Sequence, residues 1–232
     1  MVDSATPFWD IGELFSDALR IDLVAPQPRQ DSDLLQQVGF LPGLKELLML
    51  RQVHALEHAT VWVLSELAEA ARRNEANSAP QNDTSIGGIS TERGFYLYGP
   101  VETARLSWAV RRALNRITSG EWNLAIHPRC GTNLSVGMML TAGFALGFHL
   151  LLPRGPIEQL IGLGLATTTA AQLTPGFGRL TQQYLTTAIP FNLAVESVTP
   201  LPENLAFLPQ VGIPAERADH APVHFVQVRW VE

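Results

Sequence analysis

The stretch Leu134–Leu152 reads LSVGMMLTAGFALGFHLLL and contains no charged side chain. As a helix, these nineteen residues are long enough to cross a hydrocarbon core of about 30 Å. Small residues of the kind that let membrane helices approach closely recur along it, namely Gly137, Ala142, Gly143 and Gly147. The stretch therefore predicts a transmembrane helix.

A second apolar segment follows directly after the turn Pro153–Pro156. Residues Ile157–Leu173 read IEQLIGLGLATTTAAQL, in which threonines and glutamines dilute the apolar character. Packing against the first helix would tolerate these polar groups, so we expect a transmembrane helical hairpin with the lipid bilayer as its partner. A buried helical hairpin in a soluble protein is the alternative interpretation.

The composition excludes several classes of protein. Charged residues make up 16% of the chain, against roughly 25% in a typical soluble domain. A hydrophobic content of 46% excludes a disordered chain, and a net charge of −6 excludes a strongly basic nucleic-acid binder, so we expect no nucleic-acid partner. One cysteine excludes an intrachain disulfide.

The arginines indicate how the predicted hairpin is oriented. Those that flank it are Arg111, Arg112, Arg116, Arg129 and Arg179, whereas the connecting turn carries Arg154. Because short cytoplasmic loops carry an excess of basic residues, this bias predicts an integral membrane protein with both termini in the cytoplasm. The start MVDSATPFWD has no basic-then-apolar run, so we expect no cleavable signal peptide.

The rest of the chain predicts a mainly α fold of the α+β type. The expected elements are an amphipathic helix at 8–23, a linker at 26–33, one long helix at 44–73, a loop at 74–83, a small β-hairpin at 87–99, a helix at 101–117, and C-terminal strands at 192–198 and 223–231. We divide the chain into an N-terminal helix and linker (1–43), a metal-site region (44–133), the membrane helical hairpin (134–190) and a strand-containing tail (191–232).

The long helix contains the arrangement H-x-x-E-H at His54–His58. Residues four apart share one face of a helix, so His54 and His58 can direct two ring nitrogens at one point. Glu57 lies about 60° around the helix from His54, where it could reach a metal-bound water or orient a histidine. Because the neighbouring residues are mostly apolar, burying this polar group unpaired would be costly, and a metal ion would satisfy it.

A second candidate group is the turn His127-Pro128-Arg129-Cys130. A histidine and a cysteine three residues apart, with proline and glycine bending the chain, can form a compact pair of ligands. Together with His54 and His58, they would complete a set of three histidines and one cysteine, which suits the tetrahedral coordination of Zn²⁺. We therefore predict His54, His58, His127 and Cys130 as zinc ligands.

Other polar residues have simpler interpretations. We expect His149 to hydrogen-bond to a neighbouring helix, although a ligand or proton-relay role is the alternative. We expect His220 and His224 to face solvent or a strand edge. Residues 90–93 of the predicted β-hairpin form either a flap over the site or an exposed turn. Without a metal, the histidines and Glu57 would form a buried hydrogen-bond network.

Three stretches together resemble a family of uncharacterised cyanobacterial membrane proteins over roughly residues 44–190. They are HALEHAT at 54–60, GGISTERGF at 87–95 and HPRCGTN at 127–133. More distantly, the first and third are similar to a bacterial membrane family described as predicted metal-dependent enzymes, in which H-x-x-E-H-K and HPRCGTS motifs precede a membrane segment. The matched positions are His54, Glu57, His58, His127, Cys130, Gly131 and Thr132. Ala59 and Asn133 depart from that pattern, standing where it has lysine and serine.

Two functions follow from a metal site at a membrane hairpin. In a metal-dependent hydrolase, a metal-activated water would attack an amide or ester, with Glu57 as the catalytic general base. Four protein ligands would instead close the zinc shell, as in structural sites. The competing hypothesis is therefore a non-enzymatic scaffold or assembly factor, in which zinc pins the long helix to the turn. Both leave the substrate or protein partner open.

Overall fold

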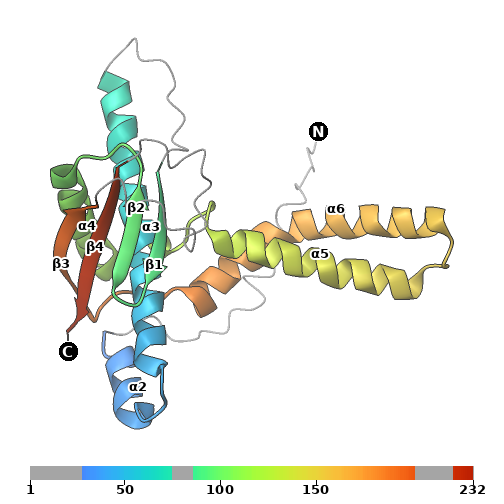
Figure 1. The fold of residues 1–232 in the computed structure, drawn as a ribbon, viewed down its shortest axis with the longest axis horizontal. Coiled ribbons are helices and arrows are strands. Elements are labelled where there is room, and N and C mark those ends of the chain that lie inside the picture. The colour runs from blue at the N-terminus through green and yellow to red at the C-terminus, as the bar shows by residue number, and fades with distance from the viewer. Residues whose placement is uncertain (1–27, 75–85, 202–221, 232) are drawn as a thin grey trace, which may run out of the picture. The chain divides into compact units, whose positions relative to one another are not determined.

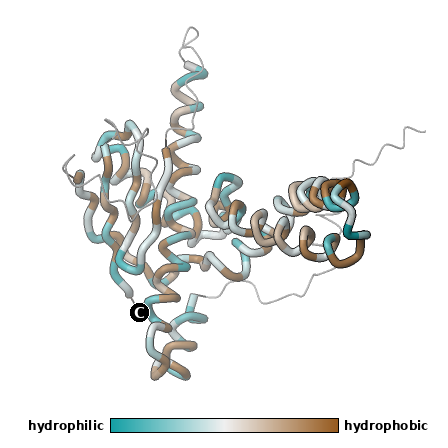
Figure 2. The backbone as a smooth tube through the Cα atoms, turned by 45° about the vertical axis from the view of Figure 1, so that its right-hand side comes forward, coloured by the Kyte–Doolittle hydropathy of each residue, from teal (hydrophilic) through white to brown (hydrophobic). Residues whose placement is uncertain are grey.

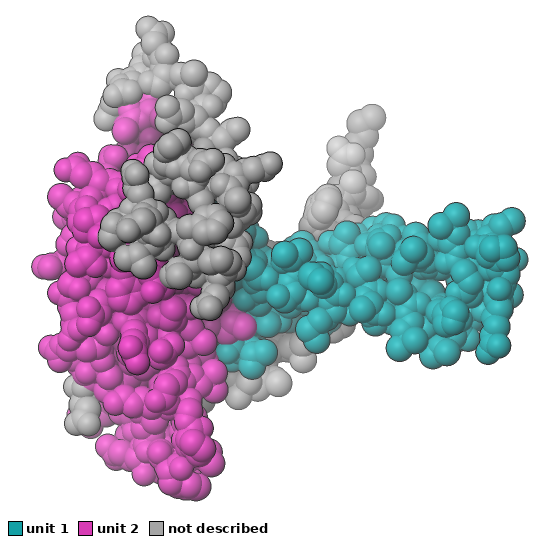
Figure 3. All heavy atoms as spheres, in the orientation of Figure 1, with its two compact units in different colours: residues 1–25, 127–185 teal, residues 26–126, 186–232 magenta. Residues whose placement is uncertain are grey.

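The computed structural model describes residues 28–74, 86–201 and 222–231. These residues divide into two compact units, which Figure 3 shows in separate colours. Residues 127–185 belong to the first unit, and the other described residues belong to the second. The predicted helix at 8–23 and most of the predicted loop at 74–83 lie outside the described residues.

The second unit contains a four-stranded antiparallel sheet in the order β1-β2-β4-β3. Its strands are β1 (Gly87–Thr91), β2 (Gly94–Tyr98), β3 (Leu193–Pro200) and β4 (Val223–Trp230). β1 and β2 form the expected hairpin, and β4 pairs with β2 on one side and β3 on the other. The predicted β-hairpin and both C-terminal strands are thus confirmed, and they join in one sheet.

Two helices pack against one another and against this sheet (Figure 1). α3 (Leu44–Asn74) runs for 31 residues because its sequence contains neither glycine nor proline. α4 (Thr103–Thr118) buries Leu106, Ala109, Val110, Ala113 and Ile117. With Val53 and Leu56 of α3 and Phe95 of β2, these side chains form the hydrophobic core. Both predicted helices are confirmed.

One element of the second unit differs from the prediction. Residues 30–33, expected in a linker, begin the helix α2 (Gln30–Val38). Asp31 and Asp33 lie in its first turn, where negative charge interacts favourably with the helix dipole. Asp31 also accepts a hydrogen bond from Gln52 of α3 over 2.5 Å. The helix is therefore stabilised by a tertiary contact, which the local polar sequence does not reveal.

The first unit is a helical hairpin of α5 (Gly131–Leu151) and α6 (Pro156–Thr181). Small residues of α6 recur every four or eight positions along one face and are buried, namely Gly162, Ala166, Ala170 and Gly178. A Cβ atom at Gly178 would lie 2.0 Å from Oδ1 of Asn133. The two helices approach closely because these side chains are absent or small.

The hairpin contains many hydrophobic residues, which are drawn brown in Figure 2. No residue of α5 is buried, and its exposed side chains include Leu134, Met138, Met139, Leu146, Leu150 and Leu151. Among the described residues, α5 alone is long and apolar enough to cross a membrane. The helical hairpin is therefore confirmed, but α6 does not qualify as a second span, because its threonines and glutamines lower its mean hydropathy.

Candidate metal site

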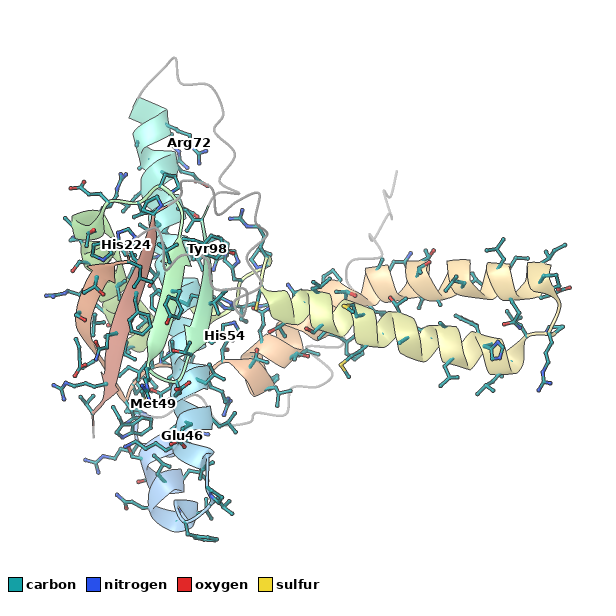
Figure 4. The ribbon with its side chains drawn as sticks, viewed as in Figure 1. Glu46, Met49, His54, Arg72, Tyr98 and His224 are labelled. Carbon is teal, nitrogen blue, oxygen red and sulfur yellow. The ribbon has the colours of Figure 1, made fainter. Side chains whose placement is uncertain are left out.

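The helix α3 places the three polar residues of H-x-x-E-H against the interior of the second unit. His58 and Glu57 are buried, with 3% and 7% of their surfaces exposed, and His54 is half-buried. Figure 4 shows His54 on α3. Ala55, Leu56 and Ala59 on the same turns lie in the core, which fixes the rotation of the helix.

Both histidines use Nδ1 to contact a backbone carbonyl oxygen. Nδ1 of His58 lies 2.6 Å from the oxygen of Ala125, and Nδ1 of His54 lies 3.0 Å from the oxygen of Thr186. A carbonyl oxygen only accepts, so each Nδ1 carries the proton and donates it. In the neutral rings the lone pair is consequently on Nε2, the arrangement that metal-binding histidines adopt.

The two rings lie close together. Their centroids are 4.4 Å apart with the planes tilted by 59°, and each ring offers one nitrogen within 4.8 Å of the other. Two imidazoles that direct Nε2 from one helix face form a pair of nitrogen ligands for a cation. The geometry of this pair matches the prediction from the H-x-x-E-H spacing.

Glu57 points from α3 toward the edge of the sheet. The hydroxyl of Ser90 on β1 donates a hydrogen bond to Oε2 of Glu57 over 2.5 Å. Burial raises the pKa of the Glu57 carboxyl, while the Ser90 hydrogen bond and the charge of His54 lower it in part. The carboxyl group is thus held in a poorly solvated place beside a histidine, with its pKa above the ordinary value.

Gly88 is a residue of this site that the sequence reasoning did not single out. A Cβ atom there would lie 2.6 Å from Oε1 and 2.8 Å from Cγ of Glu57, so the strand covers the carboxyl group without a side chain between them. The Gly-Gly pair at 87–88 was the available signal. Of the predicted flap or exposed turn at residues 90–93, Ser90 lies in the strand β1, and Glu92 and Arg93 form an exposed turn.

The segment before the second motif is fixed to α3. A short 3₁₀ helix, η2 (Trp122–Ala125), ends at the carbonyl that His58 contacts. The indole nitrogen of Trp62 donates to the carbonyl oxygen of Ile126 over 3.0 Å. Two side chains of α3 therefore hold the chain immediately before His127.

Within the first unit, His127 and Cys130 lie in a tight turn at the start of α5. His127 is buried; its backbone N–H donates to Gln182, and its Nδ1 accepts a hydrogen bond from the Arg129 N–H over 3.3 Å. Cys130 is the N-cap residue, and its sulfur accepts from the N–H of Thr132 over 3.4 Å. A helix N-terminus stabilises a thiolate, which is the form of cysteine that binds metals.

Of the residues that the sequence predicts as ligands, His54 and His58 lie together in the second unit, where their paired rings could bind a metal ion. Cys130 and His127 lie in the turn of the first unit. Their roles as further ligands, the role of Glu57 as general base and the identity of the metal remain predictions.

The remaining histidines show one confirmed and one wrong prediction. His149 contacts Gln159 of α6 over 2.7 Å, as expected of a bond to the neighbouring helix. His224, expected at a strand edge or in solvent, is instead 2% exposed, because β4 lies between β2 and β3. Figure 4 shows His224 on this strand. Its Nε2 lies 3.0 Å from the hydroxyl of Thr103, and burial lowers its pKa. His220 lies outside the described residues.

Comparisons with known proteins identify a family. Residues 49–198 match the model of a domain of unknown function, DUF6391. The chain is also 46% identical over 225 residues to an uncharacterised protein of Picosynechococcus sp., an alignment that covers 96% of this chain and 95% of that protein. No solved structure matches. These findings support the resemblance to an uncharacterised cyanobacterial family, whereas the more distant likeness to metal-dependent enzymes stays a prediction.

Proposed function

The chain belongs to the DUF6391 family, and on that premise we propose that it is a membrane-embedded, zinc-binding protein. The observation that carries the proposal is the orientation of His54 and His58. Both rings donate Nδ1–H to a backbone carbonyl, which leaves both Nε2 atoms as acceptors on one face of α3. Donation of Nδ1–H to a backbone carbonyl is the arrangement that metal-binding histidines usually adopt, and here two adjacent rings on one helix face share it.

The donor set suits zinc. Two imidazole nitrogens and the sulfur of Cys130 are ligands that Zn²⁺ prefers over hard cations such as Mg²⁺. The hydrogen bonds from α3 to the backbone at 125 and 126 support the inclusion of Cys130, because they hold the chain only a few residues before it. Three protein ligands would leave the fourth tetrahedral position for water or a substrate.

Such an open site would favour a hydrolase of amides or esters. A bound Zn²⁺ would supply the Lewis acidity that activates water near neutral pH. Glu57 would then accept the proton of the attacking water, and Ser90 would hold the carboxyl group in position through its bond to Oε2. The raised pKa of Glu57 is the direction that suits a general base working near neutral pH.

A structural zinc site is the second candidate, favoured by one observation. His127 lies buried in the same turn as Cys130, three residues before it. If its ring gave up the hydrogen bond from the Arg129 N–H and Nδ1 bound the metal instead, four protein ligands would close the shell, and the protein would act as a scaffold or assembly factor. Zinc K-edge absorption distinguishes the two, because three nitrogen/sulfur ligands plus an oxygen scatter differently from a closed set.

The membrane part of the proposal rests on α5. Its exposed leucines and methionines surround the helix, and no charged residue interrupts it. An apolar surface of this extent would be unfavourable in water and favourable in lipid. The helix α5 therefore supports the proposal of an integral membrane protein.

The test is the zinc content of the protein purified in detergent. We expect about one zinc per chain in the wild type and a loss of most of it in His58→Ala, since a site that loses one of three ligands loses most of its affinity. His149→Ala removes a histidine outside the site and is expected to retain the metal. A wild-type protein without zinc after zinc-supplemented expression would refute the proposal, as would full zinc content in both His54→Ala and His58→Ala.

A further inference from the structure

The strand β1 forms one edge of the sheet beside Glu57. Its hydrogen-bond register decides which of its backbone groups face outward. The N–H of Val228 donates to the oxygen of Arg93, so Gly94 turns its own backbone groups away from β4 and toward Thr91 of β1. At the other end of β2, the Gly99 N–H donates to the oxygen of Pro222, which shows the same alternation of residues that face β4 and residues that face β1.

Antiparallel pairing alternates, so Gly87, Ile89 and Thr91 bond to β2. The backbone N–H and C=O groups of Gly88 and Ser90 therefore point toward the outer edge of β1. No described strand pairs with that edge. Two residues thus present alternating donors and acceptors to an incoming chain.

The same two residues carry the contacts to Glu57. Ser90 donates its hydroxyl to Oε2, and Gly88 lies directly against Oε1 and Cγ. A chain paired with Gly88 and Ser90 would consequently run next to the carboxyl group. Its backbone would lie alongside the helix face that bears His54 and His58, since Glu57 lies between these two residues in the sequence.

β1 also lacks the features that normally protect an exposed edge. Proteins discourage unwanted pairing there with lysine, proline or inward-pointing charge. The sequence of β1, GGIST, contains none of these. Gly88 has no side chain that could shield its outward backbone groups, and the Glu57 carboxyl group lies directly against that face of the strand.

We propose that the outer edge of β1 binds an extended peptide segment as an added antiparallel strand, through the backbone groups of Gly88 and Ser90. The main-chain ladder would supply affinity for any extended polypeptide, as in other cases of strand addition. This binding is independent of zinc; only the consequence that the bound segment is the substrate of the site rests on the proposed function. The ligand class is a peptide in extended conformation rather than a lipid or nucleotide, because the edge offers backbone partners and no charged side chain.

The test uses fluorescein-labelled β-casein as an unstructured polypeptide and the Glu57→Gln protein, in which cleavage is blocked. Ser90→Ala and Ser90→Pro form a matched pair: both lose the hydroxyl, but only proline also lacks the outward N–H. We expect Ser90→Pro to bind casein about fivefold more weakly than Ser90→Ala, the change that loss of one hydrogen bond produces. Equal binding by the two variants would overturn the proposal, and so would the absence of casein binding by the Glu57→Gln protein.

A second measurement avoids reliance on the proline variant. Amide hydrogen exchange of the Glu57→Gln protein should slow at Ser90 and Gly88 when casein is added, and should remain unchanged at Ile89, which already bonds to β2. Unchanged exchange at all three positions would also overturn the proposal. Zinc content measured in parallel separates the two hypotheses. Casein binding by a protein without zinc would refute the proposed metal site and leave strand addition intact. Zinc binding without casein binding would refute strand addition and leave the metal site intact.

Discussion

Ser90 on β1 donates a hydrogen bond to the buried carboxyl group of Glu57 on α3, linking two residues that are 33 positions apart in the chain. This contact opposes the effect of burial on the carboxyl group, because a hydrogen bond to the ionised form stabilises it. The strand therefore adjusts the charge state of a residue that the helix alone would leave in an apolar place.

Replacing Ser90 by alanine should raise the pKa of Glu57 further, since the bond that lowers it is lost. The measurement is an infrared titration of the buried carboxylic-acid band, with Glu57→Gln used to assign the band. Ser135→Ala, which removes an exposed hydroxyl on α5, should leave this titration unchanged. A band that titrates at the same pH in Ser90→Ala and wild type would contradict the role given to Ser90.

Gly88→Ala should destabilise the second unit by about 1–3 kcal/mol, because the new Cβ would overlap Oε1 and Cγ of a carboxyl side chain that is too buried to move aside. Denaturant unfolding followed by tryptophan fluorescence measures the change. The matched control is Gly164→Ala on α6, where an added Cβ meets nothing within 4 Å. Equal stability of Gly88→Ala and wild type would show that β1 does not lie against Glu57.

His224 should make the fold sensitive to acid. Burial lowers its pKa in the folded state below the ordinary value of 6.5, so as the pH falls through 6.5 the unfolded chain takes up a proton before the folded one does. The contribution of His224 to stability is therefore constant above this pH and decreases below it. Unfolding free energies from pH 8 to pH 5 should fall less steeply in His224→Phe than in the wild type. Identical slopes would mean that His224 titrates normally in the folded protein.

Cys130 is the N-cap residue of α5 and a proposed zinc ligand, and substitution can separate these two roles. Serine at this position keeps an N-cap oxygen for α5, whereas alanine removes the cap at a cost of about 1 kcal/mol. Both substitutions remove the sulfur and should lower zinc content, but only Cys130→Ala should also lower the thermal midpoint of the metal-free protein. Retention of zinc by both variants would exclude Cys130 as a ligand.

An arginine on α5 should impair membrane insertion. Leu146 is exposed on this helix, and a charged residue at the centre of a membrane helix costs about 2.5–3.5 kcal/mol on insertion scales. Leu146→Arg should shift the protein from the carbonate-resistant membrane fraction to the soluble or aggregated fraction. Leu47→Arg, at an exposed leucine of α3, should not change the distribution. Equal membrane retention of the two variants would argue against insertion of α5.

Much of the local structure could be predicted because it depends on short-range patterns. Absence of glycine and proline predicted α3, and glycine-bounded β-forming residues predicted β1 and β2. The run at 30–33 was misassigned because its helix gains from a contact with Gln52, 21 residues away, which no local pattern contains. The exposed position predicted for His224 is wrong for a similar reason. The sequence of β4 alone does not show that this strand lies between two others in the sheet.

The sequence by itself determined the H-x-x-E-H face and the uncharged length of α5, because helix periodicity and hydropathy are properties of consecutive residues. Only the tertiary structure decided the state of the site. The carbonyl oxygens of Ala125 and Thr186 select the tautomers of His58 and His54, and β1 brings Gly88 and Ser90 onto Glu57. These partners come from distant parts of the chain, and the direction of a ring proton or the pKa of a carboxyl group depends on neighbours in space rather than in sequence.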